Sequence, residues 1–96
     1  MIVSIQKSSF GVTATGCSVD LYTMTNHSGS SVSMINYGAI VTSIKVPDRN
    51  GILADVALGF DKLEKYLGAH GSMGDTIGRY GNRIGKGRFT LDGVTY

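Results

Sequence analysis

The residues best suited to chemistry lie between Gly74 and Phe89, a stretch that reads GDTIGRYGNRIGKGRF. It holds five of the fourteen glycines and four of the nine basic residues. Glycines let a backbone approach a ligand closely because they carry no Cβ and tolerate positive φ. Arginine guanidinium groups present planar sets of donors that suit oxygen-rich partners. The stretch therefore predicts a surface that binds an oxygen-rich ligand.

Asn82 and Arg83 are the candidate ligand-binding residues within this stretch. An asparagine amide can donate and accept hydrogen bonds at once, and an arginine can donate two bonds to neighbouring oxygens. This pairing suits a sugar, which presents hydroxyl groups and a ring oxygen. The alternative is that both side chains only hold the backbone of their own loop. The residues by themselves leave both interpretations open.

His70 and Asp75 flank the start of the glycine-rich stretch and are candidates for lining a site. Histidine is the side chain whose ordinary pKa lies nearest to neutral pH. His70 stands between Ala69 and Gly71, which is typical of a loop. The other histidine, His27, lies in a predicted turn, where we expect it to be exposed and without a role.

Several other chemistries are not supported by the spacing of the residues. A phosphate-binding P-loop needs a glycine where Tyr80 stands and a serine or threonine where Gly87 stands. His27, His70 and Cys17 show no spacing typical of metal ligands, so we expect no metal site. Cys17 has no partner base that the sequence identifies, so nucleophilic catalysis has no support. We expect no catalytic residue within the 96 positions.

A basic patch is the main rival to a sugar site. Arg79, Lys86 and Arg88 could contact phosphates while Tyr80 and Phe89 stack on bases, as in a small nucleic-acid-binding β domain. A charged strand edge that blocks pairing with other chains explains the same residues. The net charge is only +2, so we favour the strand edge and expect no nucleic-acid partner.

Length and composition restrict the possibilities further. Ninety-six residues make one domain at most. No window approaches the roughly 20 apolar residues of a membrane span, and the N-terminus lacks the apolar run of a signal peptide. Cys17 is the only cysteine, so an intrachain disulfide is impossible and a reducing compartment is favoured. We expect a cytoplasmic protein without a membrane partner.

The pattern of apolar residues predicts an all-β, mostly antiparallel fold. Apolar and polar residues alternate with a period of two, and turn residues separate the runs. In the run 39–46, we expect Ile40, Ile44 and Val46 to share one face. Strands are predicted over residues 3–6, 17–25, 32–37, 39–46, 52–60, 89–91 and 94–96.

One segment departs from the strand period. Residues 61–67 place Leu63, Tyr66 and Leu67 at helical spacing, and Asp61 with Glu64 forms a capping-box-like pattern. We therefore expect one short helix there. The hairpin across Asp92-Gly93 follows, and its second arm reaches the last residue. We interpret this as one portion of a longer domain, with strand edges that can self-associate.

The order of five motifs resembles the N-terminal region of the aldose 1-epimerases. The similarity extends over nearly the whole chain, from residue 10 onward. Members of this family have a large antiparallel β-sandwich, of the galactose mutarotase-like supersandwich type. They interconvert the α and β anomers of hexoses such as galactose and glucose without a cofactor. The motifs are N-Y-G-A at 36–39, P-D-R-N-G at 47–51, D-V-A-L-G-F-D at 55–61, G-R-Y-G-N-R-I-G-K-G-R-F at 78–89 and L-D-G at 91–93.

The resemblance implies roles for two residues and the absence of others. Asn82 and Arg83 match family positions that contact the sugar. The family's general-acid histidine, general-base glutamate and a further substrate-binding histidine have no counterpart here. The resemblance thus implies an inactive N-terminal fragment of one domain, 1–96. Met73-Gly74-Asp75 departs from the aromatic, glycine and small residue that many members have there, which leaves Asp75 without an implied role. A non-catalytic carbohydrate-binding domain is the alternative.

Overall fold

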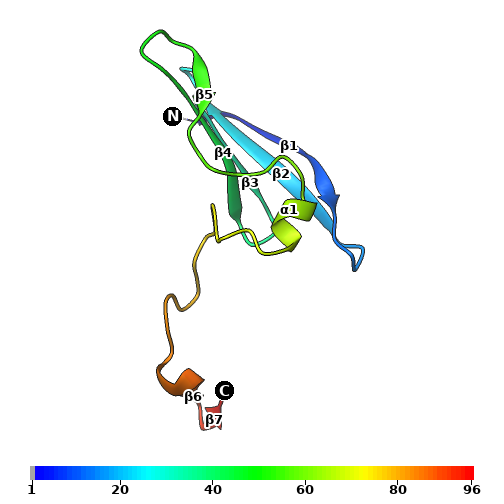
Figure 1. Cartoon of the computed structure of the whole chain (residues 1–96), viewed down its shortest axis with the longest axis vertical. Coiled ribbons are helices and arrows are strands. Elements are labelled where there is room, and N and C mark those ends of the chain that lie inside the picture. Colours follow the sequence, from blue (N-terminus) through cyan, green and yellow to red (C-terminus); the bar gives the residue numbers. More distant parts are fainter. Residues whose placement is uncertain (1) are drawn as a thin grey trace.

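A computed structural model describes residues 2–96, and it consists mainly of one antiparallel sheet (Figure 1). Neighbouring strands in the chain are neighbours in the sheet, in the order β1-β2-β3-β4-β5. This arrangement confirms the all-β, antiparallel prediction. The strands are β1 (Ile2–Val12), β2 (Ser18–Asn26), β3 (Ser31–Ile35), β4 (Ile40–Pro47) and β5 (Leu53–Asp55).

The C-terminal third contains only short elements. Helix α1 (Glu64–Leu67) follows the sheet, and a single 3-10 turn, η1 (Gly85–Gly87), precedes a two-stranded sheet. That sheet is the predicted hairpin of β6 (Thr90–Leu91) and β7 (Val94–Thr95). Its turn residues Asp92 and Gly93 have φ of 49° and 79°, as a two-residue type I′ turn requires.

The first strand is longer than the sequence predicted. We expected the strand to end at residue 6, but β1 continues through Ser8, Ser9 and Gly11 to Val12. Ser9 pairs with Asp20 and Gly11 pairs with Val19, so Phe10 is the extra residue of a bulge, and the φ of Gly11 there is 151°. The predicted end at residue 6 was wrong, because a bulge lets a strand continue through a glycine.

A bulge also changes which residues of β4 share a face. Ser33 pairs with Ser43, but Met34 pairs with Val41, so Thr42 is the extra residue. The bulge reverses the alternation, and Ile40 therefore packs in the core with Ile35, on the same side as Ser43. The prediction that Ile40 shares a face with Ile44 and Val46 was wrong, because strict alternation fails across a bulge.

The predicted return strand 52–60 ends early, at Asp55. The Asp55 carboxylate accepts hydrogen bonds from the backbone N–H groups of Ile44 and Ala57, at 3.0 and 3.1 Å. The Asp55 side chain thus occupies the Ile44 N–H of β4, which the backbone of β5 would have bonded if the strand had continued. The apolar alternation in this segment predicted a strand, but this side-chain competition turns the chain away from the sheet.

The short helix is confirmed, although its start was misplaced. Asp61 does not cap it: the N-cap residue is Leu63, and no side chain caps the helix. Leu63 and Tyr66 are nevertheless buried as their spacing predicted, with exposed fractions of 1% each. They join a small core with Val19, Ile35 and Ile40, so the helix covers one end of the sheet (Figure 1).

Two loop glycines lie directly against the backbone of β4. A Cβ at Gly59 would overlap the carbonyl oxygen of Thr42, and it would also lie 2.9 Å from the Tyr66 hydroxyl. A Cβ at Gly74 would overlap the carbonyl oxygen of Val41. Only glycine allows both loops to lie this close to the strand.

The chain after residue 76 extends away from the sheet (Figure 1). The Cα radius of gyration is 17.2 Å, whereas a compact domain of this length has about 13 Å. Every residue from 77 to 96 is exposed. Arg88, which we expected on a strand, lies between η1 and β6 instead. Within residues 2–96, no helix has the length and apolar character that a membrane span requires.

We expect Gly59→Ala to destabilise the sheet, because the new methyl group must displace the Thr42 carbonyl or the loop. Overpacking of this kind typically costs about 1–3 kcal/mol. The midpoint of urea unfolding, followed by circular dichroism, measures the change. Gly68→Ala is the matched control, because a Cβ at Gly68 meets no atom within 4 Å and its φ is −101°. Equal midpoints for the two variants would contradict the role given to Gly59.

Candidate functional site

The glycine-rich segment is attached to the sheet at its first residues. The N–H of Val41 in β4 donates to the carbonyl oxygen of Gly74 at 2.9 Å. The Thr76 hydroxyl donates to the carbonyl oxygen of Ala39 at 2.6 Å. Both bonds hold the start of the glycine-rich segment at the N-terminal end of β4. The rest of the segment continues from this attachment point.

His70 and Asp75 contact each other at this attachment point. The His70 Nε2 atom lies 2.8 Å from Asp75 Oδ1, and His70 Nδ1 lies 3.1 Å from the carbonyl oxygen of Gly68. The two side chains are 15% and 25% exposed, so both are largely shielded from water. The structure thus brings together two of the four predicted site residues as an ion pair.

The contact shifts the pKa of each side chain in the direction that favours its charged form. The pKa of His70 is raised, chiefly by the hydrogen bond to Asp75 and then by the bond to the Gly68 carbonyl. The pKa of Asp75 is lowered, chiefly by the same bond to His70, against the opposing effect of desolvation. A charge-assisted bond of this length is among the stronger hydrogen bonds in proteins.

A cleft of about 370 Å³ lies beside the pair. Its walls come from the β3–β4 turn and from the first residues of the glycine-rich segment. The size suits a small polar molecule, and the pair supplies the charged part of the wall. The lining residues are Tyr37, Gly38, Ile40, His70, Asp75, Thr76, Ile77 and Gly78.

Asn82 and Arg83 lie further along the segment, and both are exposed. Asn82 has a φ of 67°, a left-handed conformation that asparagine adopts more readily than most residues. Neither side chain makes a hydrogen bond or ion pair within the part of the chain that the structure describes. Their polar groups are therefore available to a ligand, and the role of both residues stays a prediction.

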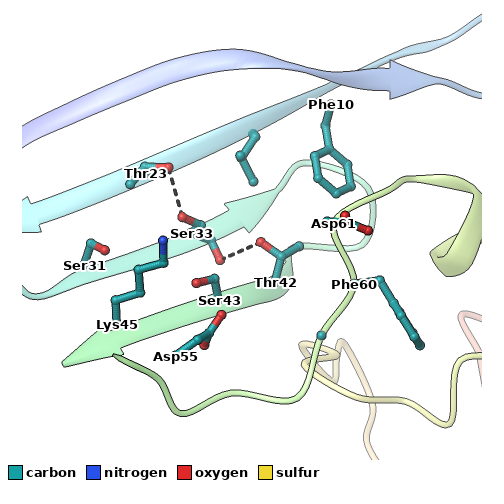
Figure 2. Close-up of a pocket in the computed structure, with 12 residues that line it drawn as sticks. Phe10, Thr23, Ser31, Ser33, Thr42, Ser43, Lys45, Asp55, Phe60 and Asp61 are labelled. Carbon is teal, nitrogen blue, oxygen red and sulfur yellow. Dashed lines mark hydrogen bonds between the residues drawn. The ribbon is translucent and has the colours of Figure 1, made fainter. Parts of the chain in front are cut away.

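A larger hollow than the His70–Asp75 cleft lies elsewhere in the structure, and the sequence did not indicate it. It is a trough of about 520 Å³ on the sheet face beside α1, with Phe10 and Phe60 at one end (Figure 2). Thr23 and Ser33 hydroxyls bond each other there at 2.9 Å, and Lys45 points into the trough (Figure 2). The signal available was the run of hydroxyl residues at matching strand positions, which we did not interpret as a surface.

The trough does not show the features of a reactive site. Of the two carboxylates that line it, Asp55 and Asp61, the first accepts hydrogen bonds from backbone N–H groups, and the hydrogen bond from Ser43 is the main cause that lowers the pKa of Asp55. The hydroxyls of Thr23, Ser33 and Thr42 are bonded within the sheet. We therefore place the candidate site at the His70–Asp75 cleft and not at the larger trough.

The remaining titratable candidates lie apart from the cleft. Cys17 and His27 are both exposed, Cys17 in the β1–β2 connection and His27 in the β2–β3 turn. Among residues 2–96, no three acidic, histidine or cysteine side chains gather closely enough to hold a metal ion.

The chain is similar in sequence to proteins named galactose mutarotase and aldose 1-epimerase. Over 95 residues it is 39% identical to a galactose mutarotase of Sus scrofa, which covers 99% of this chain. It is 49% identical over 65 residues to the galactose mutarotase of Bos taurus, which covers 68% of it. An aldose 1-epimerase of Escherichia coli K12 is 36% identical over 75 residues, or 78% of the chain.

The matches involve only a part of these relatives. The chain spans 28% of the length of the Sus scrofa protein, 19% of the Bos taurus protein and 22% of the Escherichia coli protein. The part that it matches is their N-terminal portion. The model of the family described as aldose 1-epimerase matches residues 20–96, which include the cleft and the whole glycine-rich segment. The chain therefore belongs to the aldose 1-epimerase family.

Proposed function

We propose that this chain supplies part of the sugar-binding surface of an aldose 1-epimerase that acts on hexoses such as galactose and glucose. The observation that carries the proposal is the family match across residues 20–96, which includes Asn82 and Arg83. The exposure of both side chains, without partners in the described residues, supports it further. We place the protein in the cytoplasm, since its single cysteine suits a reducing compartment.

The reaction that we propose for the whole enzyme is acid–base catalysis. A carboxylate takes the proton from the anomeric hydroxyl while an imidazolium protonates the ring oxygen. The ring opens, the C1–C2 bond rotates, and the reverse transfers close the ring on the other face. Both groups must be held on opposite sides of the sugar with suitable pKa values.

In this chain, His70 and Asp75 do not provide such an opposed pair. They bond directly to each other at 2.8 Å, so no sugar fits between them. The role that we propose for the chain is to bind the sugar: Arg83 donates to neighbouring hydroxyl oxygens, and the Asn82 amide donates and accepts beside it. A carbohydrate-binding domain without catalysis is the second candidate, and this engagement of His70 with Asp75 favours it for the isolated chain.

We expect Arg83→Ala to weaken catalysis in a full-length version of the protein. Loss of a charged hydrogen bond typically costs about 1.5–3 kcal/mol. That loss corresponds to a decrease in kcat/KM of roughly 10- to 150-fold. Polarimetry with freshly dissolved α-D-galactose measures the rate. Arg88→Ala is the control, and it should change the rate little. Equal rates for the Arg83→Ala variant and the unmodified protein would exclude the sugar contact.

The 96-residue chain by itself should not accelerate mutarotation to an enzymatic rate. Each positioned proton-transfer group contributes typically 10²–10⁴-fold, and the described residues contain no free pair beside the segment. Polarimetry on α-D-glucose with and without the chain tests this expectation. An equilibration rate far above the buffer rate, lost in His70→Gln, would show that the chain is catalytic after all.

We also expect the isolated chain to self-associate. Strand β1 has an unpaired edge with Val3 and Ile5 exposed at 53% and 63%, and such edges pair with other chains. Size-exclusion chromatography should show a dimer or larger species, and Ile5→Lys should shift the population toward monomer. Ile52→Lys is the matched control, since Ile52 is 64% exposed but lies in the β4–β5 turn. A monomer at all concentrations would refute this expectation.

A further inference from the structure

Both ring nitrogens of His70 face atoms that accept hydrogen bonds. Nε2 faces the Asp75 carboxylate at 2.8 Å, and Nδ1 faces the Gly68 carbonyl oxygen at 3.1 Å. A carbonyl oxygen and an ionised carboxylate have no proton to donate, and a neutral imidazole carries only one N–H. Only the protonated ring can make both bonds at once, so this geometry belongs to the imidazolium form.

The surroundings of His70 support a charged ring that is held in place. The Tyr66 ring packs against it edge-on, with centroids 5.6 Å apart and an interplanar angle of 68°. Asp75 is the one charged group that faces it among the described residues. The other titratable side chains near the ring are the phenols of Tyr66 and Tyr37. The raised pKa of His70 and the lowered pKa of Asp75 agree with this geometry.

The contact joins two parts of the chain. Gly68 directly follows α1, and Asp75 lies between Gly74 and Thr76, the two residues that attach the glycine-rich segment to β4. The Asp75 N–H also donates to the Ser72 carbonyl at 3.3 Å, which closes the intervening turn. His70 thus holds the start of this segment against the end of the helix.

We propose that protonated His70 is a positioning residue, which fixes the start of the segment that carries Asn82 and Arg83, so that sugar binding weakens when the imidazolium loses its proton. This inference rests on the proposed function for its sugar-binding part. Neither Asn82 nor Arg83 has a bond of its own to the sheet in the described residues. The attachment at residues 74–76 is therefore the constraint nearest to them on the N-terminal side.

The expected pH dependence follows from the two shifts. The pKa of His70 is raised in the folded protein, so its contribution is complete below about 6.5 and is lost as pH rises through the folded pKa. The pKa of Asp75 is lowered, so its contribution is complete above the ordinary value of 3.8 and is lost as pH falls through the folded pKa. The segment should be held best at mildly acidic to neutral pH.

The first test follows the imidazole of His70 by ¹⁵N NMR in a His27→Gln background, which leaves a single histidine. We expect both ring nitrogens to be protonated at mildly acidic pH, with a midpoint above about 6.5 that falls in Asp75→Asn. The exchange protection of the Val41 amide, which bonds Gly74, should decrease severalfold when His70 deprotonates. A midpoint at or below about 6.5, or unchanged protection, would overturn the proposal.

The second test measures KM for galactose against pH in a full-length version. We expect KM to rise severalfold between about pH 6 and about pH 8.5, and to lose this dependence in His70→Gln, which cannot change charge. Asp92→Asn, a carboxylate change in the β6–β7 turn, should keep the dependence. If galactose binds and the profiles of His70→Gln and the unmodified protein coincide, the positioning role fails while the proposed function stands. If galactose binds at no pH, the proposed function fails, and this role fails with it.

Discussion

Strand β4 extends beyond the residues that pair with β5, and loop residues supply hydrogen-bond partners for the remaining backbone groups. β5 pairs only with Lys45 to Pro47. Further along, Ile44 bonds the Asp55 carboxylate and the Val56 N–H, and Val41 bonds Gly74. Unpaired backbone groups are costly when water cannot reach them, so these contacts determine the path of the chain after β5. Gly59 and Gly74 allow their loops to approach β4 closely, because a Cβ at either position would overlap a carbonyl oxygen of the strand.

This constraint on β4 connects the core with the candidate site. Gly59 brings its loop close enough for the Tyr66 hydroxyl to accept from the Phe60 N–H at 2.7 Å. Tyr66 in turn packs against His70, and His70 bonds Asp75 next to Gly74. One buried tyrosine therefore links the sheet, the helix and the start of the glycine-rich segment. The cleft lies where these parts meet, and its charged wall is held from several directions.

Beyond this attachment, the glycine-rich segment makes few contacts within the described chain. Its exposed residues include Tyr80, Ile84 and Phe89, at 73%, 40% and 48%. One face of the sheet also carries a shallow apolar groove lined by Met24, Val32 and Ile44. Asn82 and Arg83 lie on the glycine-rich segment, whose bonds to the sheet are at its first residues, Gly74 and Thr76.

The sequence by itself determined the fold class, the Asp92-Gly93 turn and the helix around Tyr66, because local periodicity and turn chemistry govern these features. It also indicated the family through its five motifs, and it singled out His70, Asp75, Asn82 and Arg83. Only the tertiary structure decided the facing of Ile40 and the early end of β5. The facing of Ile40 depends on the bulge at Thr42 in the pairing of β3 with β4, and the end of β5 depends on the hydrogen bond from the Ile44 N–H to the Asp55 carboxylate. The contact between His70 and Asp75, and the requirement for glycine at residues 59 and 74, likewise follow from loops that pack against β4, which no local pattern encodes.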